Sequence, residues 1–185
     1  MYFAIMQNVG SSSVPHGCKC GWFGDSKHEC RCTPLQIRNY RDKISGPLLY
    51  RIDIHIEVLS VRYQELTSLG AGEPSSEIRK RVIAARNIQK ERFKGPALSL
   101  SKGLRKVHCN AAMRTKDMAK FCGLKDDAQS LLKMAINELN FSARAYDRIL
   151  KVSRTIADLA GSDQIESEHI SEAIQYRTLD RQFWI

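Results

Sequence analysis

The sequence has no long hydrophobic run and few of the residues that dominate fibrous or low-complexity chains. No apolar stretch among its 185 residues reaches the roughly 18 residues that a membrane span needs. Its 11 Gly and 5 Pro are too few for a collagen-like or low-complexity protein. Residues 1–10 have neither the basic region nor the cleavage pattern of a signal peptide. The composition therefore predicts a soluble cytoplasmic protein with no membrane partner, made of one domain or of one domain and an appendage.

The motifs of the common catalytic sites are also missing. The sequence contains no G-x-x-x-x-G-K-[ST] phosphate loop and no apolar strand that ends in Asp-Glu to hold Mg²⁺. No Ser/His/Asp or Cys/His set stands out among its five His. Residue types alone leave open whether the chain is an enzyme.

Positive charge is in excess, and it is unevenly distributed. The chain has 29 Lys and Arg against 20 Asp and Glu, a net charge of +9. Residues 77–106 hold ten of these cations and only two Glu. Such a block indicates a polyanionic partner, which could be nucleic acid, a nucleotide or an acidic protein face. If the partner is DNA, we expect contacts from Arg79, Arg86 and Lys90, which share one face of a predicted helix. Phe93 is the one aromatic residue of this block, too few for an interleaving of rings and cations, so the block predicts weak, sequence-independent binding to phosphates. A solvated helix face is the alternative.

Four of the six cysteines lie close together in a C-x-C-x9-C-x-C pattern. Two short arms of this kind can bring four thiolates to one point, the tetrahedral sulfur site that zinc favours. Gly, Asp and Ser between the arms are turn formers, as a small metal-held loop requires. We therefore predict a structural zinc ion in residues 16–34, the cysteine loop, with the ligands Cys18, Cys20, Cys30 and Cys32. His16 or His28 could replace one ligand, and four free thiols are the remaining alternative.

Hydrophobic periodicity divides the chain into three parts. Residues 1–65 read as mixed α and β structure, 66–74 as a linker, and 75–185 as helix throughout. The first fifteen residues predict a frayed strand followed by a loop that holds three serines. A short helix is expected over 35–41, a loop with a helical turn over 44–51, and a strand over 52–58, where apolar and polar residues alternate.

Five further helices and their caps are predicted beyond the linker. The first runs from a cap at Ser75 or Ser76 to about Phe93, and its apolar face carries Ile78, Val82, Ala85 and Ile88. A short helix starts at Thr115, another spans 126–139, and a last one runs from Ser167 to about Tyr176. The longest is capped by Ser142 and closed by Gly161, and it turns toward a core the side chains of Tyr146, Ile149, Leu150, Ile156 and Leu159.

Two long stretches resemble a known family. Residues 18–58, CKCGWFGDSKHECRCTPLQIRNYRDKISGPLLYRIDIHIEV, resemble the C-P-C-G-Y-x-G-D cysteine loop and the ISGPLLDRIDLHVEV stretch of Mg-chelatase-like AAA+ ATPases of the YifB/ComM type. Residues 141–183, FSARAYDRILKVSRTIADLAGSDQIESEHISEAIQYRTLDRQF, resemble the C-terminal domain of that family. The resemblance covers about residues 16–183.

The resemblance implies a fold and a function. The family forms rings, hydrolyses ATP with Mg²⁺ and, in its competence branch, moves DNA during recombination. This chain resembles the C-terminal third: the mainly α portion made of the end of an AAA+ α/β core (1–65) with its zinc loop, followed by a helical lid bundle (75–185). A homo-oligomeric ring, most plausibly a hexamer, and DNA are the implied partners, and ATP would bind only with an N-terminal core.

Individual residues follow from the same resemblance. Arg51, in PLLYRID, resembles an arginine finger that acts in the neighbouring subunit's site, where its planar charge stabilises the γ-phosphate. Arg144, in SARAYDR, resembles the sensor-2 arginine of the lid, with Arg148 as a second ATP contact. Alternatively, Arg51 pairs with an acid of the following strand and Arg144 with Asp147 or Asp158.

The sequence departs from the family in two places. The acidic residue that precedes the finger in the family is Tyr50 here, and the asparagine-bearing turn before the first cysteine reads Pro15-His16-Gly17. Two other functions stay open. One is a stand-alone zinc-bearing basic DNA-binding or adaptor module. The other is metal insertion into a porphyrin, which the cysteine loop disfavours because chelatase subunits are not expected to carry it.

Overall fold

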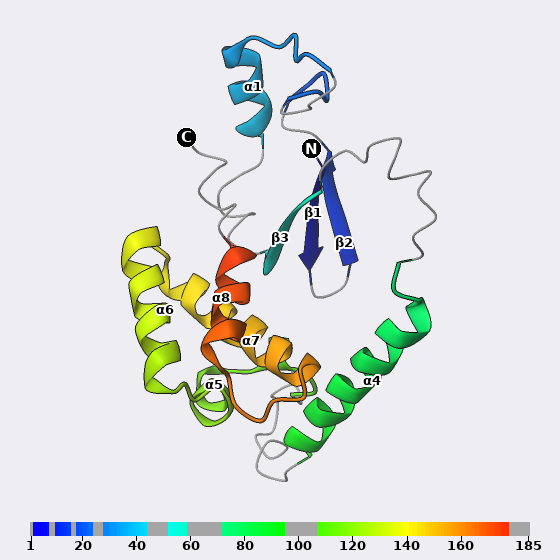
Figure 1. Ribbon diagram of the computed structural model, residues 1–185. Helices are drawn as coiled ribbons and strands as arrows, with labels where there is room; N and C mark the ends of the chain where they lie inside the picture. Colours follow the sequence, from blue (N-terminus) through cyan, green and yellow to red (C-terminus); the bar gives the residue numbers. More distant parts are fainter. Residues whose placement is uncertain are drawn as a thin grey trace, which may run out of the picture. The chain divides into compact units, whose positions relative to one another are not determined.

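The computed structural model describes residues 2–7, 10–15, 18–23, 28–43, 52–58, 72–94 and 107–177. For the strand residues up to 15, and for residues 57 and 58, it describes the backbone alone. The described part is mainly helical and divides into two compact units (Figure 1). The sheet unit takes in the described residues up to Val58 together with residues 175–177, and the helical unit extends from Gly72 to Ile174. None of the described helices is long and apolar enough to cross a membrane.

A three-stranded antiparallel sheet forms the base of the sheet unit (Figure 1). Its strands are β1 (Tyr2–Gln7), β2 (Gly10–Pro15) and β3 (Ile54–Val58), in the order β2-β1-β3. β3 confirms the strand predicted from alternation, although it begins two residues later. The loop predicted for the serines is wrong, because they lie in β2, where Ser11 to Ser13 pair with β1. Edge strands tolerate polar residues, since one backbone edge and often one face stay in water.

The chain returns to β3 after its last described helix. The backbone amide of His55 donates to the carbonyl of Tyr176 at 2.9 Å, and Nη1 of Arg177 donates to the carbonyl of Ile52 at 2.6 Å. Arg177 and Ile52 are each only 1% exposed. A buried charged hydrogen bond of this kind fixes the backbone at the start of β3.

The second arm of the cysteine loop leads directly into α1 (Pro34–Arg41). Thr33 and Gln36 form a reciprocal cap: the Gln36 amide donates to Oγ1 of Thr33 at 3.3 Å, and the Thr33 amide donates to Oε1 of Gln36 at 3.1 Å. Pro34 fits the first helical turn because its missing N–H would have no partner there. The capped helix holds the end of the cysteine loop in a defined direction. The turn predicted over 44–51 lies outside the described residues.

Five α-helices and a 3₁₀ turn make up the described helical unit (Figure 1). They are α4 (Ser75–Arg92), η2 (Asn110–Ala112), α5 (Thr115–Phe121), α6 (Asp126–Leu139), α7 (Ala143–Leu159) and α8 (Ser167–Gln175). Every predicted helix of this unit is confirmed to within about two residues. Gly161 closes α7 as predicted: its φ of 70° is left-handed, and the amide of Ser162 bonds back to the carbonyl of Ala157 at 2.8 Å.

One apolar core fills the helical unit, and α7 supplies its centre with Ile149, Leu150 and Ala157. Partly buried Ile156 packs against it. Tyr146 and Leu159 were also predicted to face the core, but they are 40% and 43% exposed because the helix turns them off the buried face at its two ends. The other buried apolar members are Phe93, Val107, Met113, Met118, Cys122, Ala128, Leu132, Ala135, Ile165, Ile170, Ala173 and Ile174.

Helix α4 corrects two sequence predictions. Its N-cap is Pro74, with no side-chain hydrogen bond, so neither serine caps it. Its buried residues are Ala85 and Gln89, whereas the other apolar residues of the predicted face are exposed, by 43% at Ile78, 45% at Val82 and 37% at Ile88. The helix packs mainly through its C-terminal half, and all of residues 72–80 are exposed. Periodicity alone could not show where along the helix packing ends.

Candidate functional site

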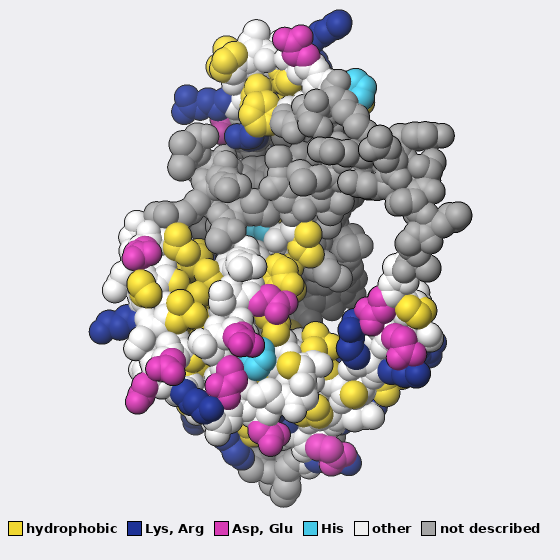
Figure 2. Space-filling view, viewed as in Figure 1, with side chains coloured by type: hydrophobic (Ala, Val, Ile, Leu, Met, Phe, Trp, Pro, Cys, Tyr) yellow, Lys and Arg dark blue, Asp and Glu magenta, His cyan; other side chains and the backbone are white. Residues whose placement is uncertain are grey.

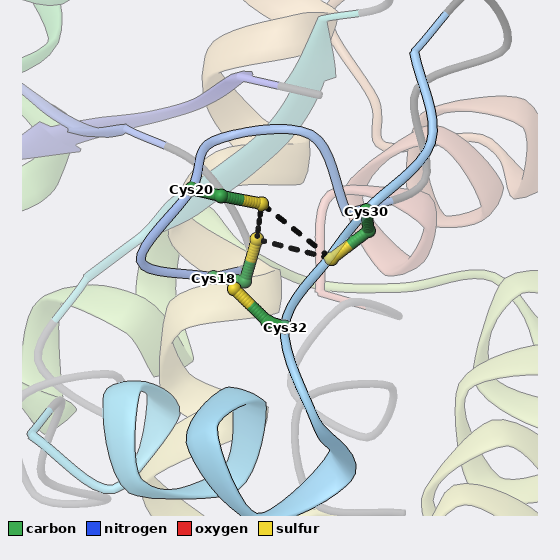
Figure 3. A group of neighbouring side chains, drawn as sticks. All are labelled: Cys18, Cys20, Cys30 and Cys32. Atoms are coloured by element: carbon green, nitrogen blue, oxygen red, sulfur yellow. Dashed lines mark hydrogen bonds between the residues drawn. The ribbon is translucent and has the colours of Figure 1, made fainter.

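The four loop cysteines converge on one point (Figure 3). The Sγ atoms of Cys18 and Cys20 lie 3.2 Å apart, and each lies 3.6 Å from Sγ of Cys30. The Sγ atom of Cys32 completes the group, and all four Sγ atoms lie within 4.8 Å of one another. Zinc–sulfur bonds of about 2.3 Å in a tetrahedron put sulfur atoms roughly 3.8 Å apart. The cluster therefore has the donor type, number and spacing of a tetrahedral metal site.

Local backbone geometry explains why these cysteines meet. The Gly21 amide donates to the carbonyl of Cys18 at 3.2 Å, which closes a tight turn around the first arm. Gly21 has a φ of 86°, a conformation that only glycine adopts without strain. In the second arm the chain passes Cys30 and Cys32 and enters the Thr33 cap of α1. The turn and the helix cap together hold both arms.

The thiols influence one another strongly. The Trp22 amide and the Cys18 thiol donate hydrogen bonds that lower the pKa of Cys20 to about 6. The Cys32 amide also lowers the pKa of Cys30, but loss of water and the neighbouring sulfurs outweigh it and raise that pKa to about 12. The pKa of Cys32 is raised by the same desolvation and neighbouring sulfurs. One thiolate thus forms readily and further ones are disfavoured, unless a cation offsets their charge.

The proposed ATP contacts Arg144 and Arg148 lie in the first two turns of α7. Ser142 caps this helix by accepting a hydrogen bond from the Ala145 amide at 3.3 Å, as predicted. Arg144 is exposed, and among the described residues it pairs with neither Asp147 nor Asp158. Arg148 is half-buried. An exposed arginine at a helix N-terminus is well placed for an anion, because the helix dipole adds to its charge. Arg51 lies outside the described residues.

Lys151 is a basic residue of the same helix face that the sequence analysis missed. It follows Arg144 by seven positions and Arg148 by three, the spacing of one helical row. Its Nζ donates to the carbonyl of Ala111 at 3.2 Å, and burial, the strongest influence, lowers its pKa. Seven-residue spacing was the signal that could have revealed it.

The three cations predicted to contact DNA lie exposed on α4, in a helical unit whose visible face mixes charged and apolar side chains (Figure 2). Neighbouring cations pair with acids: Lys80 with Glu77 at 2.7 Å and Arg81 with Glu73 at 2.8 Å. By contrast, Arg79, Arg86 and Lys90 form no ion pair within the described ranges, and Arg86 donates only to the Gln89 side chain at 3.0 Å. We call Arg79, Arg86 and Lys90 the α4 basic row.

A buried ionic cluster was not predicted from the sequence. Asp158 on α7 accepts two hydrogen bonds from Arg92 on α4, one of them at 2.7 Å, and one from Nε of Arg154 at 3.0 Å. The Asn110 amide group donates to the same carboxylate at 2.7 Å and to Thr155 at 3.1 Å. The cluster ties α4 and η2 to α7. The four-residue spacing of Arg154 and Asp158 is the one part of the cluster that the sequence could have revealed. Arg92, which lies 66 residues before Asp158, completes the cluster.

Comparison with known proteins identifies the family to which the chain belongs. The family model described as "Magnesium chelatase, subunit ChlI C-terminal" matches residues 72–177, and the one described as "Magnesium chelatase, subunit ChlI" matches residues 4–66. The chain belongs to the Mg-chelatase-like family that includes ComM and YifB. The first model covers the helical unit, and the second covers the end of β1, the cysteine loop, and strands β2 and β3.

Individual members of the Mg-chelatase-like family align with most of the chain. Competence protein ComM of Haemophilus influenzae is 41% identical over 152 residues, which is 82% of this chain and 27% of ComM. YifB of Salmonella typhimurium and YifB of Escherichia coli are 37% and 36% identical over the same length, with 28% of each covered. The chain thus spans a little over a quarter of the length of these relatives.

Proposed function

We propose that this chain works as the C-terminal part of a ring-forming ATPase of the ComM/YifB type that remodels DNA, and that it supplies an arginine finger and a nucleotide-sensing lid. The 185 residues carry no phosphate-loop motif, so hydrolysis requires an ATPase core joined to them. The observation that carries the proposal is Arg144, an exposed guanidinium in the first turn of α7 that forms no ion pair among the described residues.

In this proposal Arg144 acts within its own subunit as the sensor-2 residue. Its guanidinium would bind the γ-phosphate, and Arg148, one turn further, would be a second contact. Planar guanidinium groups match phosphate oxygens with paired hydrogen bonds. Because α7 also provides the centre of the helical core through Ile149 and Leu150, a phosphate-induced shift of α7 would move the packed lid with it.

Arg51 would act across the subunit interface as an arginine finger. It directly precedes Ile52, whose carbonyl is held by the buried Arg177. A fixed backbone on one side of a finger lowers the entropy lost when the guanidinium reaches a neighbouring site. The family's acidic residue before the finger is Tyr50 in this chain, so any contact made by that acid is lost here.

The cysteine cluster fits a structural zinc ion held by Cys18, Cys20, Cys30 and Cys32. Four sulfur ligands would fill a tetrahedral shell and leave no position for a reactive water. When bound, zinc would supply a cross-link between the two arms of the loop. The residues of this chain would do the rest: the Gly21 turn and the Thr33 cap orient the two arms toward one point.

The α4 basic row would contact DNA through phosphates. Its three cations lie on one helix face and have no acidic partner among the residues described, so their charge is available to a polyanion. The same observation favours a second function: a stand-alone zinc-bearing DNA-binding or adaptor module that never joins an ATPase ring. The two functions differ in one respect, because only the first makes Arg144 matter for ATP hydrolysis.

An ATPase measurement tests the proposal. The chain alone is expected to hydrolyse no ATP, whereas the chain joined to the N-terminal remainder of Haemophilus influenzae ComM is expected to be active. Arg144→Ala in the joined protein should lower turnover by about tenfold to a hundredfold, the effect of removing one charged hydrogen bond. The matched control is Lys133→Ala, an exposed cation of α6. Equal activity of the Arg144 and Lys133 variants would contradict the proposal.

A further inference from the structure

The cysteine loop displays a large aromatic ring to solvent. The Trp22 side chain is 43% exposed, and its ring stacks on that of His28 with centroids 3.9 Å apart and planes inclined by 31°. The Trp22 amide donates a hydrogen bond to the sulfur of Cys20, so the backbone that carries the ring is held by the cysteine cluster. An aromatic ring that is exposed and anchored loses little entropy when a flat partner stacks on it.

Exposed cations lie on both arms of the cysteine loop and on α1. The middle residue of each C-x-C arm must face outward when its two cysteines face inward, and in both arms it is basic. These residues, Lys19 and Arg31, are exposed, as is Arg38 on α1. None of the three forms an ion pair within the described stretches 18–23 and 28–43, where five Lys or Arg stand against two acidic residues, Glu29 and Asp42.

A loop that exposes an aromatic ring, together with cations that form no ion pair among the described residues, matches the chemistry of single-stranded nucleic acid. Every unpaired base offers a flat face for stacking, and its backbone offers a phosphate for each cation. A duplex keeps its bases stacked on one another, so it can use the cations but not the ring. The α4 basic row can contact phosphates, but its helix has no aromatic residue on which a base could stack.

We propose that the cysteine loop binds an unpaired stretch of DNA, with Trp22 stacking on a base and Lys19 and Arg31 contacting phosphates. The proposal rests on the proposed function in one respect, the choice of DNA as the strand. It does not need ATP hydrolysis, a ring or the α4 basic row. A protein that remodels DNA would thereby hold duplex and unpaired strands on different surfaces.

The competing occupant is a protein surface. Leu35, on α1 next to the second arm, is 66% exposed and could form an apolar patch together with Trp22. A protein partner would use both side chains for burial and would gain little from Lys19 and Arg31. Stacking on a base instead needs the π face, which Leu35 lacks. Substitutions at these two positions therefore separate the two occupants.

Tryptophan fluorescence gives a direct measurement. The chain has two tryptophans, Trp22 and Trp184, so Trp184→Phe leaves Trp22 as the only reporter. The 185-residue protein is titrated with an oligothymidylate of about 12 nucleotides, the length that one such surface covers. Stacking on Trp22 is expected to quench its emission in a saturable manner. A duplex of the same length should quench little, and replacing the α4 basic row with glutamine should leave the quenching unchanged.

Variants then identify the contacts, with binding measured by polarisation of labelled oligothymidylate and zinc content measured as a check on the loop. Trp22→Ala should weaken binding by about tenfold, Trp22→Phe should restore most of it, and Leu35→Ala should have no effect. Lys19→Gln with Arg31→Gln should lower the salt dependence. The proposal is wrong if Trp22 emission does not change with oligothymidylate, if duplex quenches it equally, or if Leu35→Ala weakens binding as much as Trp22→Ala. DNA binding lost only with the α4 basic row would overturn this inference while leaving the proposed function intact.

Discussion

At the scale of single residues, Cys20 differs from the other cysteines of the loop. Its pKa is about 6, whereas that of Cys30 is about 12, so near neutral pH the loop without metal holds a thiolate at Cys20 and a protonated thiol at Cys30. Zinc needs thiolates, so binding must release protons from the remaining thiols. If the site holds zinc, its binding should therefore release protons from the loop.

Metal analysis tests this site. Protein prepared without chelator should contain about one zinc per chain, and the affinity should fall as the pH is lowered because protons compete for the sulfurs. Cys30→Ser should remove most of the metal, while Cys109→Ser, which changes a cysteine outside the cluster, should leave it in place. A wild-type protein with almost no zinc and four titratable thiols in the loop would show that the site is not a metal site.

Asp158 carries the second residue-scale prediction. Burial by itself raises its pKa, but hydrogen bonds from Arg92 and Asn110 and the charges of Arg92 and Arg154 outweigh burial and lower it. Its contribution to stability is thus present above the unfolded pKa of about 3.9 and is lost as the pH falls toward the lower folded value. Removing one partner of a buried ion pair costs about 3–5 kcal/mol.

We therefore expect Asp158→Asn to lower the free energy of unfolding by about 3 kcal/mol at neutral pH and by much less at strongly acidic pH. Urea unfolding at several pH values measures this. Glu138→Gln, which neutralises an exposed acid of α6, is the matched control and should change stability little. If the loss of unfolding free energy caused by Asp158→Asn does not become smaller as the pH falls, cavity or packing changes, rather than charge, cause it.

At the scale of elements, α4 combines two roles on different faces. Ala85, Gln89 and Arg92 fix its C-terminal half to the core and the ionic cluster, while the basic row faces solvent. The other cations of the helix are paired with acids: Lys80 with Glu77, Arg81 with Glu73 of the preceding segment, and Arg92 with Asp158 of α7. This division separates cations that support the helix from those available to DNA.

The salt dependence of duplex binding should show the difference. Each phosphate contact contributes a slope of about −0.9 in log K against log salt concentration. Replacing Arg79, Arg86 and Lys90 with glutamine should reduce the slope by up to about 2.7. The matched control replaces Lys80, Arg81 and Lys94, which removes the same net charge from cations that are paired with Glu. If both triple variants reduce the slope equally, DNA binding depends on the net charge of the protein and not on the α4 basic row.

Local sequence patterns predicted where helices begin and end, but they did not predict which residues these elements pack against. The caps at Thr33 and Ser142 and the closing Gly161 depend on residues within a few positions, so the sequence revealed α1 and α7 and the C-terminal end of α7. Strand β2 was missed because its pairing with β1 satisfies the backbone whatever its serines prefer. Exposure along α4 was misjudged because it depends on how far the neighbouring helices extend.

The candidate site shows the same division between local and distant information. The C-x-C arms predicted the sulfur cluster because spacing limits where the four side chains can go. The residues that complete the ionic cluster around Asp158 come from three segments, and no spacing rule brings Arg92 to it. Arg177 at the Ile52 carbonyl, 125 residues away, was equally beyond the sequence. Resemblance to the family, and not pattern, pointed to Arg51 and Arg144.

At the scale of the whole molecule, Arg51 and Arg144 would come from different subunits that share one ATP site. Arg144 would touch the nucleotide of its own subunit, and Arg51 that of its neighbour. Arginine fingers contribute roughly 10³–10⁵ in rate in related phosphoryl transfers. In the protein joined to an ATPase core, Arg51→Ala should therefore abolish turnover while ATP still binds, whereas Arg144→Ala should also disturb the response of the lid to nucleotide.

Subunit mixing tests this assignment most directly. An Arg51→Ala protein is mixed with one that lacks the phosphate-loop lysine of the joined core, and ATP hydrolysis is measured after assembly of both is confirmed. If Arg51 acts on the neighbouring subunit, some interfaces combine an intact phosphate loop with an intact finger, and the mixture recovers part of the activity that each variant lacks. Mixtures that assemble but stay inactive at every ratio would contradict the account.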